Sequence, residues 1–403
     1  MKNHTISDIL LLYVIAIPPN RDRLNMRKDV FVSTKPRVTD MTNYELRKQA
    51  EAEGKPEWMY KPVNDKLPSE ETWKTLPSYF TEMVKEKNDK VNRIMSEMVS
   101  PMSFVFFSDA HIRQNTMSSV PIIRSILENT NVKDVIYGGD TVSGWVDNDM
   151  MYEDVRYFNR AYEFAEPYIV RGNHDMEGKP FELSEEGYIA PHGDVLRELF
   201  PKFHDDVEII PGATYYSFSR HEHNIYFLVI DTTEVHERVV NPDGSWGSNV
   251  YPSEKQLRWF AESLFATPPH HSVIVLGHTP VYKELVWHFT GSQPFRDIIE
   301  AYNSRSTVMI GSTKFDFASA QGKVIMTLSG HGHTDDIFIS PTGNYVYEIN
   351  DDSNIDNGGS IYKRVAGTTS ESALDVIIID RATSKAVSIR YGAGIDREFV
   401  VGG

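Results

Sequence analysis

The chain has 403 residues, with 41 Lys and Arg against 57 Asp and Glu, and a formal net charge of −16. Its content of 40% apolar and 11% aromatic residues is enough for a large core, which excludes a mainly disordered protein. The chain contains no cysteine. This excludes disulfide frameworks, thiolate zinc sites and cysteine nucleophiles, so a metal ion has only His, Asp, Glu, Asn or backbone oxygens as ligands.

The charge is unevenly distributed along the chain. Residues 1–100 hold 17 basic and 15 acidic residues, whereas residues 101–403 hold 24 basic and 42 acidic residues. The larger part therefore carries a net charge of −18 and repels polyanions, which disfavours broad binding of nucleic acid.

The first apolar run of the chain, Ile9–Ile17, has nine residues, and a membrane-spanning helix needs about 20. Asp8 directly before the run and Pro18 directly after it are unlike the flanks of a signal peptide. We therefore interpret the run as a strand or a docking segment.

Residues 18–80 are rich in proline and charge, and two helices are expected in and after them. Thr42–Glu53 begins with a capping box, because Thr42 is followed three residues later by Glu45. Tyr79–Val99 repeats apolar residues at helical spacing, with Lys87 as a polar interruption. We expect residues 1–100 to be an extension, irregular and then helical, that docks on a protein partner or on a second copy of the chain.

Residues 101–403 form one domain in this interpretation. Alternating strands and helices come first and strands without helices come last, which predicts a large α/β domain with two sheets. The predicted strands are 103–108, 133–137, 167–171, 215–219, 225–231, 272–276, 323–328, 337–340, 345–349, 373–380 and 385–391, and the predicted helices are 117–129, 151–165 and 253–265.

Polar residues gather where five of these strands end. The loops are Asp109-x-His111, Gly139-Asp140, Gly172-Asn173-His174-Asp175, Gly277-His278 and Gly330-His331-Gly332-His333. Loops at the carboxyl ends of an open α/β sheet converge on one crevice, so these side chains are expected to meet. Five of the 14 histidines of the chain lie in these loops.

Each loop taken alone has an ordinary structural interpretation. An Asp-x-His turn, a Gly-Asp turn before a helix and a single Gly-His are common in loops without a ligand. The ordered set of five, each after a predicted strand, is what favours a site.

This ordered set resembles the calcineurin-like metallophosphoesterase superfamily, whose motifs are D-x-H, G-D, G-N-H-[DE], G-H and G-H-x-H. The resemblance covers about residues 103–335. It implies a four-layer αββα sandwich of two mixed sheets flanked by helices, with residues 1–100 outside it. It also implies a binuclear metal centre.

The resemblance assigns metal ligands residue by residue. One ion would be held by Asp109, His111, Asp140 and His333, and the other by Asp140, Asn173, His278 and His331. Such mixed ligands suit Mn²⁺, which we expect, or Fe or Zn²⁺. In the implied mechanism a metal-bridging hydroxide attacks phosphorus in line with the leaving oxygen. His174 would protonate the leaving group or hold a phosphate oxygen, and Asp175 would orient the His174 ring.

The expected function is hydrolysis of a phosphate ester, with a phosphodiester favoured over a phosphomonoester. No nucleic-acid duplex and no membrane span is expected. The alternative is a structural or interaction subunit of a larger assembly, for example a phage particle, that uses the same fold. We expect a cytoplasmic protein, or a particle-associated one if it is encoded by a phage.

Overall fold

In the computed structural model of the chain, the described residues are 52, 66–142, 148–175, 204–240, 246–282, 292–333, 335–343, 345–349 and 362–401. The chain divides into two units, Met1–Met41 and Thr42–Gly403, and every described residue belongs to the second. The run Ile9–Ile17 lies outside the described residues, as does the helix expected over 42–53 except for its residue 52, which is helical. The docking role of residues 1–100 stays a prediction.

The first sheet combines parallel and antiparallel strands. Its order is β17-β16-β15-β1-β2-β3. The strands are β1 (Pro101–Phe107), β2 (Asp134–Tyr137), β3 (Tyr168–Ile169), β15 (Ala373–Asp380), β16 (Lys385–Gly392) and β17 (Arg397–Val400). β1, β2 and β3 run parallel, and the C-terminal strands β15, β16 and β17 are joined antiparallel to them and to one another.

The second sheet has seven strands in the order β13-β14-β12-β9-β6-β5-β4. They are β4 (Glu208–Ile209), β5 (Tyr216–Arg220), β6 (Ile225–Val229), β9 (Ser272–Leu276), β12 (Lys323–Ser329), β13 (Asp335–Ile339) and β14 (Tyr345–Ile349). β6, β9, β12 and β14 are parallel. Two further hairpins pair β7 (Val235–Val240) with β8 (Trp246–Tyr251) and β10 (Thr307–Ile310) with β11 (Thr313–Asp316).

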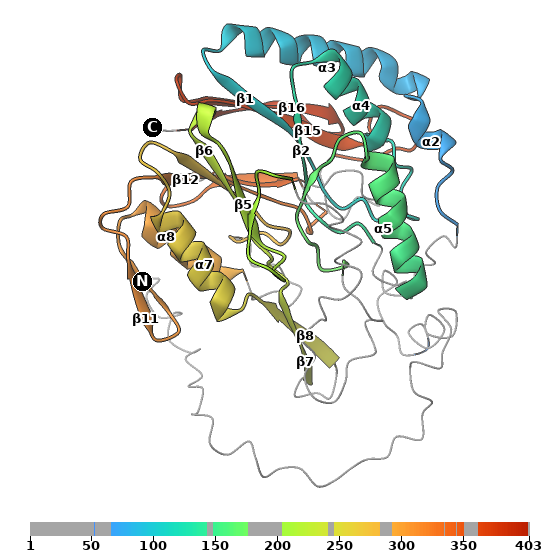
Figure 1. The fold of residues 1–403 in the computed structure, drawn as a ribbon. Helices are drawn as coiled ribbons and strands as arrows, with labels where there is room; N and C mark the ends of the chain where they lie inside the picture. Colours follow the sequence, from blue (N-terminus) through green and yellow to red (C-terminus); the bar gives the residue numbers. More distant parts are fainter. Residues whose placement is uncertain are drawn as a thin grey trace, which may run out of the picture. The chain divides into compact units, whose positions relative to one another are not determined.

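Helices cover the outer face of each sheet (Figure 1). α3 (Ser78–Glu97), α4 (Ser119–Asn129) and α5 (Asn148–Tyr162) lie on the first sheet, and α7 (Glu254–Phe265) and α8 (Gln293–Asn303) lie on the second. The short α2 (Glu71–Lys74) precedes α3, and a 3-10 turn, η3 (His221–His223), precedes β6.

Alternation along β1 shows why the layers form. Val105 and Phe107 point into the core shared with α3, α4 and α5, whereas Phe104 and Phe106 point into the core between the two sheets. Successive side chains of a strand face opposite sides, so an almost continuously apolar strand needs a partner layer on both faces. The predicted four-layer αββα sandwich of two mixed sheets is confirmed.

Helix α3 belongs to this core although it precedes the predicted domain start at residue 101. Its Phe80, Val84 and Val91 are buried against the first sheet and α4. Lys87, the polar interruption of the apolar stripe, bonds the Asp396 carboxylate at 2.9 Å. The helix expected over Tyr79–Val99 is therefore confirmed and is packed on the domain.

The sequence pattern missed α8 and several edge strands. α8 has a Pro in its first turn, where proline is tolerated because the first amides have no helical partner.

Among the described helices, none has the length and apolarity needed to cross a membrane.

Candidate metal centre

The predicted ligands all follow the carboxyl ends of parallel strands, and the structure brings these ends together. Asp109 and His111 follow β1, Asp140 follows β2, Asn173 to Asp175 follow β3, His278 follows β9, and His331 and His333 follow β12. β1, β2 and β3 belong to the first sheet and β9 and β12 to the second. We call these five loops the carboxyl rim.

The backbone of the carboxyl rim is strained. Five of the predicted ligands have positive φ angles, in a region that residues other than glycine seldom adopt: Asp109, His111, Asp140, His331 and His333. Such conformations cost free energy and persist only where surrounding contacts hold them, and they cluster at functional sites. The loops also pack very closely, because a Cβ atom at Gly172 would collide with Asp140 and one at Gly330 would collide with Asp109.

The first ligand group is Asp109, His111 and His333, whose ligand atoms lie within 4.8 Å of one another. The two Nε2 atoms of His111 and His333 are 3.1 Å apart, and Nε2 of His333 is 3.5 Å from Oδ1 of Asp109. His111 donates its Nδ1–H to the carbonyl of Val142 at 3.0 Å, which leaves the Nε2 lone pair for an ion. Burial lowers the pKa of His111 to about 4, so the ring is neutral.

The second ligand group is Asp140, His278 and His331. His278 donates Nδ1–H to the carbonyl of Gly138 at 2.8 Å, so its Nε2 faces the site. That Nε2 lies 3.0 Å from Oδ2 of Asp140 and 3.1 Å from Oδ1 of Asn173. Burial opposes protonation of His278, but Asp140 outweighs it and the pKa rises to about 10. Burial lowers the pKa of His331 to about 3.

Asp140 contacts both groups. Its Oδ2 is 3.0 Å from Nε2 of His278 and 3.8 Å from Nε2 of His111. Its Oδ1 accepts the backbone N–H of His174 at 2.8 Å. Burial would raise the pKa of Asp140, but the facing His278 lowers it well below its usual range. The buried Asp140 carboxylate thus needs a positive charge nearby, and either a proton on His278 or a metal ion can supply it.

His174 lies at the mouth of the site. Its side chain is 27% exposed, and its Nε2 is 3.9 Å from Oδ2 of Asp140. With His111 and Asp140 it makes a third group of close ligand atoms. Its buried Nδ1 has no hydrogen-bond partner among the described residues.

Asp175 makes different contacts from those expected. Its carboxylate accepts the backbone N–H groups of Asp140, Thr141, Val142 and Gly172 at 2.8 to 3.3 Å. The carboxylate therefore fixes the loop that presents Asp140, and it is not hydrogen-bonded to the His174 ring. Burial and the nearby Asp140 charge raise the pKa of Asp175.

A buried ion pair lies beside the ligand loops. Its acidic member is Asp231, which follows β6. It accepts from Nη1 of Arg171 at 2.9 Å, and both side chains are fully buried. Since Arg171 follows β3 of the first sheet and Asp231 follows β6 of the second, this pair joins the two sheets. The signal in the sequence was an arginine placed immediately before Gly172-Asn173.

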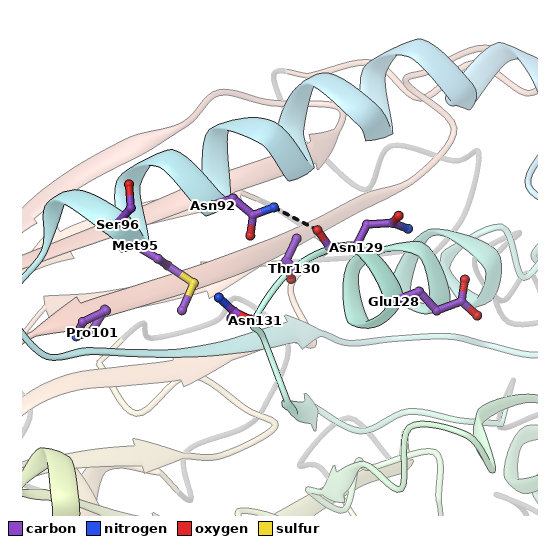
Figure 2. A pocket seen from close by; sticks show the side chains of 8 residues that line it. All are labelled: Asn92, Met95, Ser96, Pro101, Glu128, Asn129, Thr130 and Asn131. Atoms are coloured by element: carbon purple, nitrogen blue, oxygen red, sulfur yellow. Dashed lines mark hydrogen bonds between the residues drawn. The ribbon is translucent and has the colours of Figure 1, made fainter.

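One hollow among the described residues lies away from this chemistry. It measures 540 Å³ and is lined by α3, the start of β1, the end of α4 and the segment after α4 (Figure 2). Its residues are Asn92, Met95, Ser96, Pro101, Glu128, Asn129, Thr130 and Asn131. Pro101 and Phe107 are the two ends of β1, which at about 3.3 Å per residue lie roughly 20 Å apart. We call this opposite side, where the strands begin, the amino rim.

The comparison with known families decides what the carboxyl rim is. The calcineurin-like phosphoesterase family matches residues 102–335, more than half of the chain. The chain belongs to the calcineurin-like phosphoesterase family. The predicted resemblance is therefore confirmed, and the chain is a metal-dependent phosphoester hydrolase by family.

Solved structures give only distant likenesses. A dimetal phosphatase from Danio rerio has a TM-score of 0.46 at 13% identity, over 75% of this chain and 99% of its own. Vacuolar protein sorting 29 from Cryptosporidium parvum has 0.28 at 12%, over 75% and 100%. A metallophosphoesterase from Sphaerobacter thermophilus has 0.24 at 13%, over 73% and 89%. No protein with a curated description matches the sequence.

The family implies a centre of two metal ions, and the residues of the carboxyl rim fit one. Two buried carboxylates face several imidazoles, and two of these rings turn Nε2 toward the site by donating Nδ1–H to backbone carbonyls. This orientation is the usual one for metal-binding histidines.

Proposed function

We propose that the protein is a binuclear metal-dependent phosphodiesterase. The observation that carries the proposal is the pair of ligand groups on the carboxyl rim, with the Asp140 carboxylate within 4 Å of histidines from both. A shared carboxylate between two ligand sets is what holds two divalent ions close together.

The proposed ligands of one ion are Asp109, His111, Asp140 and His333, and those of the other are Asp140, Asn173, His278 and His331. The short distances within each set support this assignment, including 3.1 Å between Nε2 of His278 and Oδ1 of Asn173. Imidazole, carboxylate and amide oxygen together suit Mn²⁺, with Fe or Zn²⁺ as alternatives.

When bound, two divalent ions supply an activated water as nucleophile and neutralise charge on the phosphoryl oxygens. The chain's own residues supply the rest. His174, at the mouth of the site, donates a proton to the leaving oxygen or holds a phosphate oxygen. Asp175 acts one step away: it holds the loop that carries Asp140, so that the carboxylate is fixed before substrate binds.

Two features favour a small phosphate ester as substrate, and we propose a diester. The ester oxygen that leaves phosphorus needs a proton, and His174 is placed to give one. The net charge of −18 over residues 101–403 repels long polyanions, while two divalent ions would attract a single phosphate at the carboxyl rim.

A hydrolysis panel tests the proposal on the full chain loaded with Mn²⁺. We expect elemental analysis to find two ions per chain, and bis-p-nitrophenyl phosphate to be cleaved faster than p-nitrophenyl phosphate. Fewer than one ion per chain would refute the binuclear centre. A faster reaction with the monoester would refute the diester preference alone.

A further inference from the structure

A buried arginine outside the ligand set is bonded to a residue that closely follows the loop Gly330-His331-Gly332-His333, which we call the metal loop. Arg390, near the end of β16, is 1% exposed. Its guanidinium bonds the Asp375 carboxylate through Nε and Nη2, at 3.0 and 2.8 Å. It also bonds the Asp335 carboxylate through Nη1 and Nη2, at 3.0 and 3.1 Å. Two carboxylates are thus each held by a paired set of bonds from one planar group.

Asp335 brings this arrangement close to the metal loop. It begins β13, two residues after the proposed ligand His333, and it is 6% exposed. Arg397 of β17 adds a bond to the same carboxylate at 2.8 Å. β16 and β17 belong to the first sheet and β13 to the second, so the two arginines connect the sheets at the end of the metal loop.

The metal loop needs such an anchor. His331 and His333 both have positive φ angles, a conformation that persists only where the surrounding structure holds it. On one side the loop leaves β12, and the backbone N–H of His331 donates to the Asp109 carboxylate at 3.1 Å. On the other side Asp335, held by Arg390 and Arg397, is the anchor.

The arginine is itself held in place. The Asp396 carboxylate accepts the backbone N–H of Arg390 at 2.8 Å and also bonds Lys87 and Lys90 of helix α3. A Cβ atom at Gly394 would collide with Nη1 of Arg390, so the turn after β16 needs glycine there.

Stability alone is a weak reason for this arrangement. Burying an arginine with two carboxylates costs desolvation that the pairing barely offsets, and apolar side chains often replace such groups without loss. What the paired bonds provide is a fixed position and orientation of Asp335.

We infer that Arg390 and Arg397 are positioning residues that act through Asp335 to hold His333 in register with Asp109 and His111. The inference rests on the proposed binuclear centre. Supporting residues of metal ligands typically change metal affinity by about 10- to 100-fold when mutated.

The test compares Mn²⁺ binding by the full chain with that of Asp335→Asn, which keeps the size of the side chain and removes its charge. We expect one of the two Mn²⁺ ions to bind about 10- to 100-fold more weakly, followed by isothermal titration and by the Mn²⁺ spin-resonance signal, while the other is retained. Arg390→Lys should lower the same affinity, because lysine cannot make the paired bonds.

The matched control is Asp134→Asn at the amino rim. It breaks the paired bonds between Asp134 and Arg220, at 2.7 and 2.8 Å. We expect it to lower the melting temperature and leave Mn²⁺ binding unchanged. If both Asp335→Asn and Asp134→Asn lower the melting temperature and neither changes Mn²⁺ binding, Asp335 is only a structural cross-link and the inference is wrong.

Two further outcomes of these binding measurements also have a fixed meaning. If Asp335→Asn does not fold, Arg397→Gln at the partly exposed end of the network takes its place, and unchanged Mn²⁺ affinity in that variant overturns the inference. If the unmodified chain binds no Mn²⁺, the proposed function fails, and the inference that rests on it fails with it. Intact binding by the unmodified chain with unchanged variants refutes the positioning role alone.

Discussion

The carboxyl rim and the amino rim carry similar residues in different surroundings. His221 and His223 precede β6, and His270 and His271 precede β9, just as His278 follows β9. At the amino rim Nδ1 of His221 and Nε2 of His271 lie 3.5 Å apart. Yet all three groups of close ligand atoms found among the described residues are at the carboxyl rim.

The carboxylates explain the difference. At the amino rim Asp134 and Asp206 are bonded to the guanidinium of Arg220. At the carboxyl rim Asp109 and Asp140 are fully buried and face histidines. A buried carboxylate that faces imidazoles needs a positive charge, which a proton on a ring or a metal ion can supply, whereas one paired with arginine already has it. Surroundings, and not histidine content, make the site.

The largest effect is expected from Asp140→Ala, which removes the carboxylate that both ligand groups contact. We expect both ions to be lost and hydrolysis to fall to the metal-free background, as measured by elemental analysis and kcat/KM. Asp297→Ala, an exposed carboxylate on α8, is the control and should keep two ions. A variant at position 140 that keeps both ions would show that Asp140 does not connect the groups.

The next effect is that of His174→Ala. The ligand groups stay intact and the proton donor is lost, so kcat should fall about 10²- to 10⁴-fold while both ions are retained. Steady-state kinetics with elemental analysis of the same sample checks this. Loss of a metal ion would mean that His174 is a ligand, as its nearness to His111 and Asp140 would allow.

The two ends of helix α3 lie at opposite rims. We expect the helix to affect the stability of the fold and not the hydrolysis reaction. Its Tyr79 donates to Glu371, which also accepts from Thr116 in the loop after His111, and its other end lines the hollow at the amino rim. Phe80 is fully buried, so Phe80→Ala should cost about 3–5 kcal/mol. Urea unfolding measures this loss.

Shortened chains test the same helix. A chain that begins at residue 66 keeps α3 and should fold, bind metal and hydrolyse substrate. One that begins at residue 100 lacks the helix and should be insoluble, since the lost core contacts rival the total stability of about 5–15 kcal/mol. A soluble, metal-loaded chain from residue 100 would show that α3 is dispensable.

The smallest effect is expected at the amino rim. His271→Ala removes one of the paired rings there and should change neither the two-ion stoichiometry nor kcat/KM by more than about twofold. Elemental analysis and the hydrolysis panel measure both. A loss of one ion would place a metal site at the amino rim and contradict the difference between the two rims.

The sequence by itself predicted the layered fold and the loops that carry the proposed ligands. Apolar runs such as Phe104–Phe107 predict strands that are buried on both faces, and the five motif loops follow predicted strands whose carboxyl ends must meet. Local periodicity carries this information because strand and helix repeat over a few residues.

Tertiary structure alone decided what supports the ligands. The carboxylate of Asp175 bonds four backbone amides, Arg171 pairs with Asp231 over 60 residues of chain, and Arg390 reaches Asp335 over 55. The docking of α3 on the first sheet was decided in the same way. These contacts join residues far apart in the chain, and a pairing over such separations leaves no periodic trace in the sequence, because it depends only on which loops the two sheets bring together.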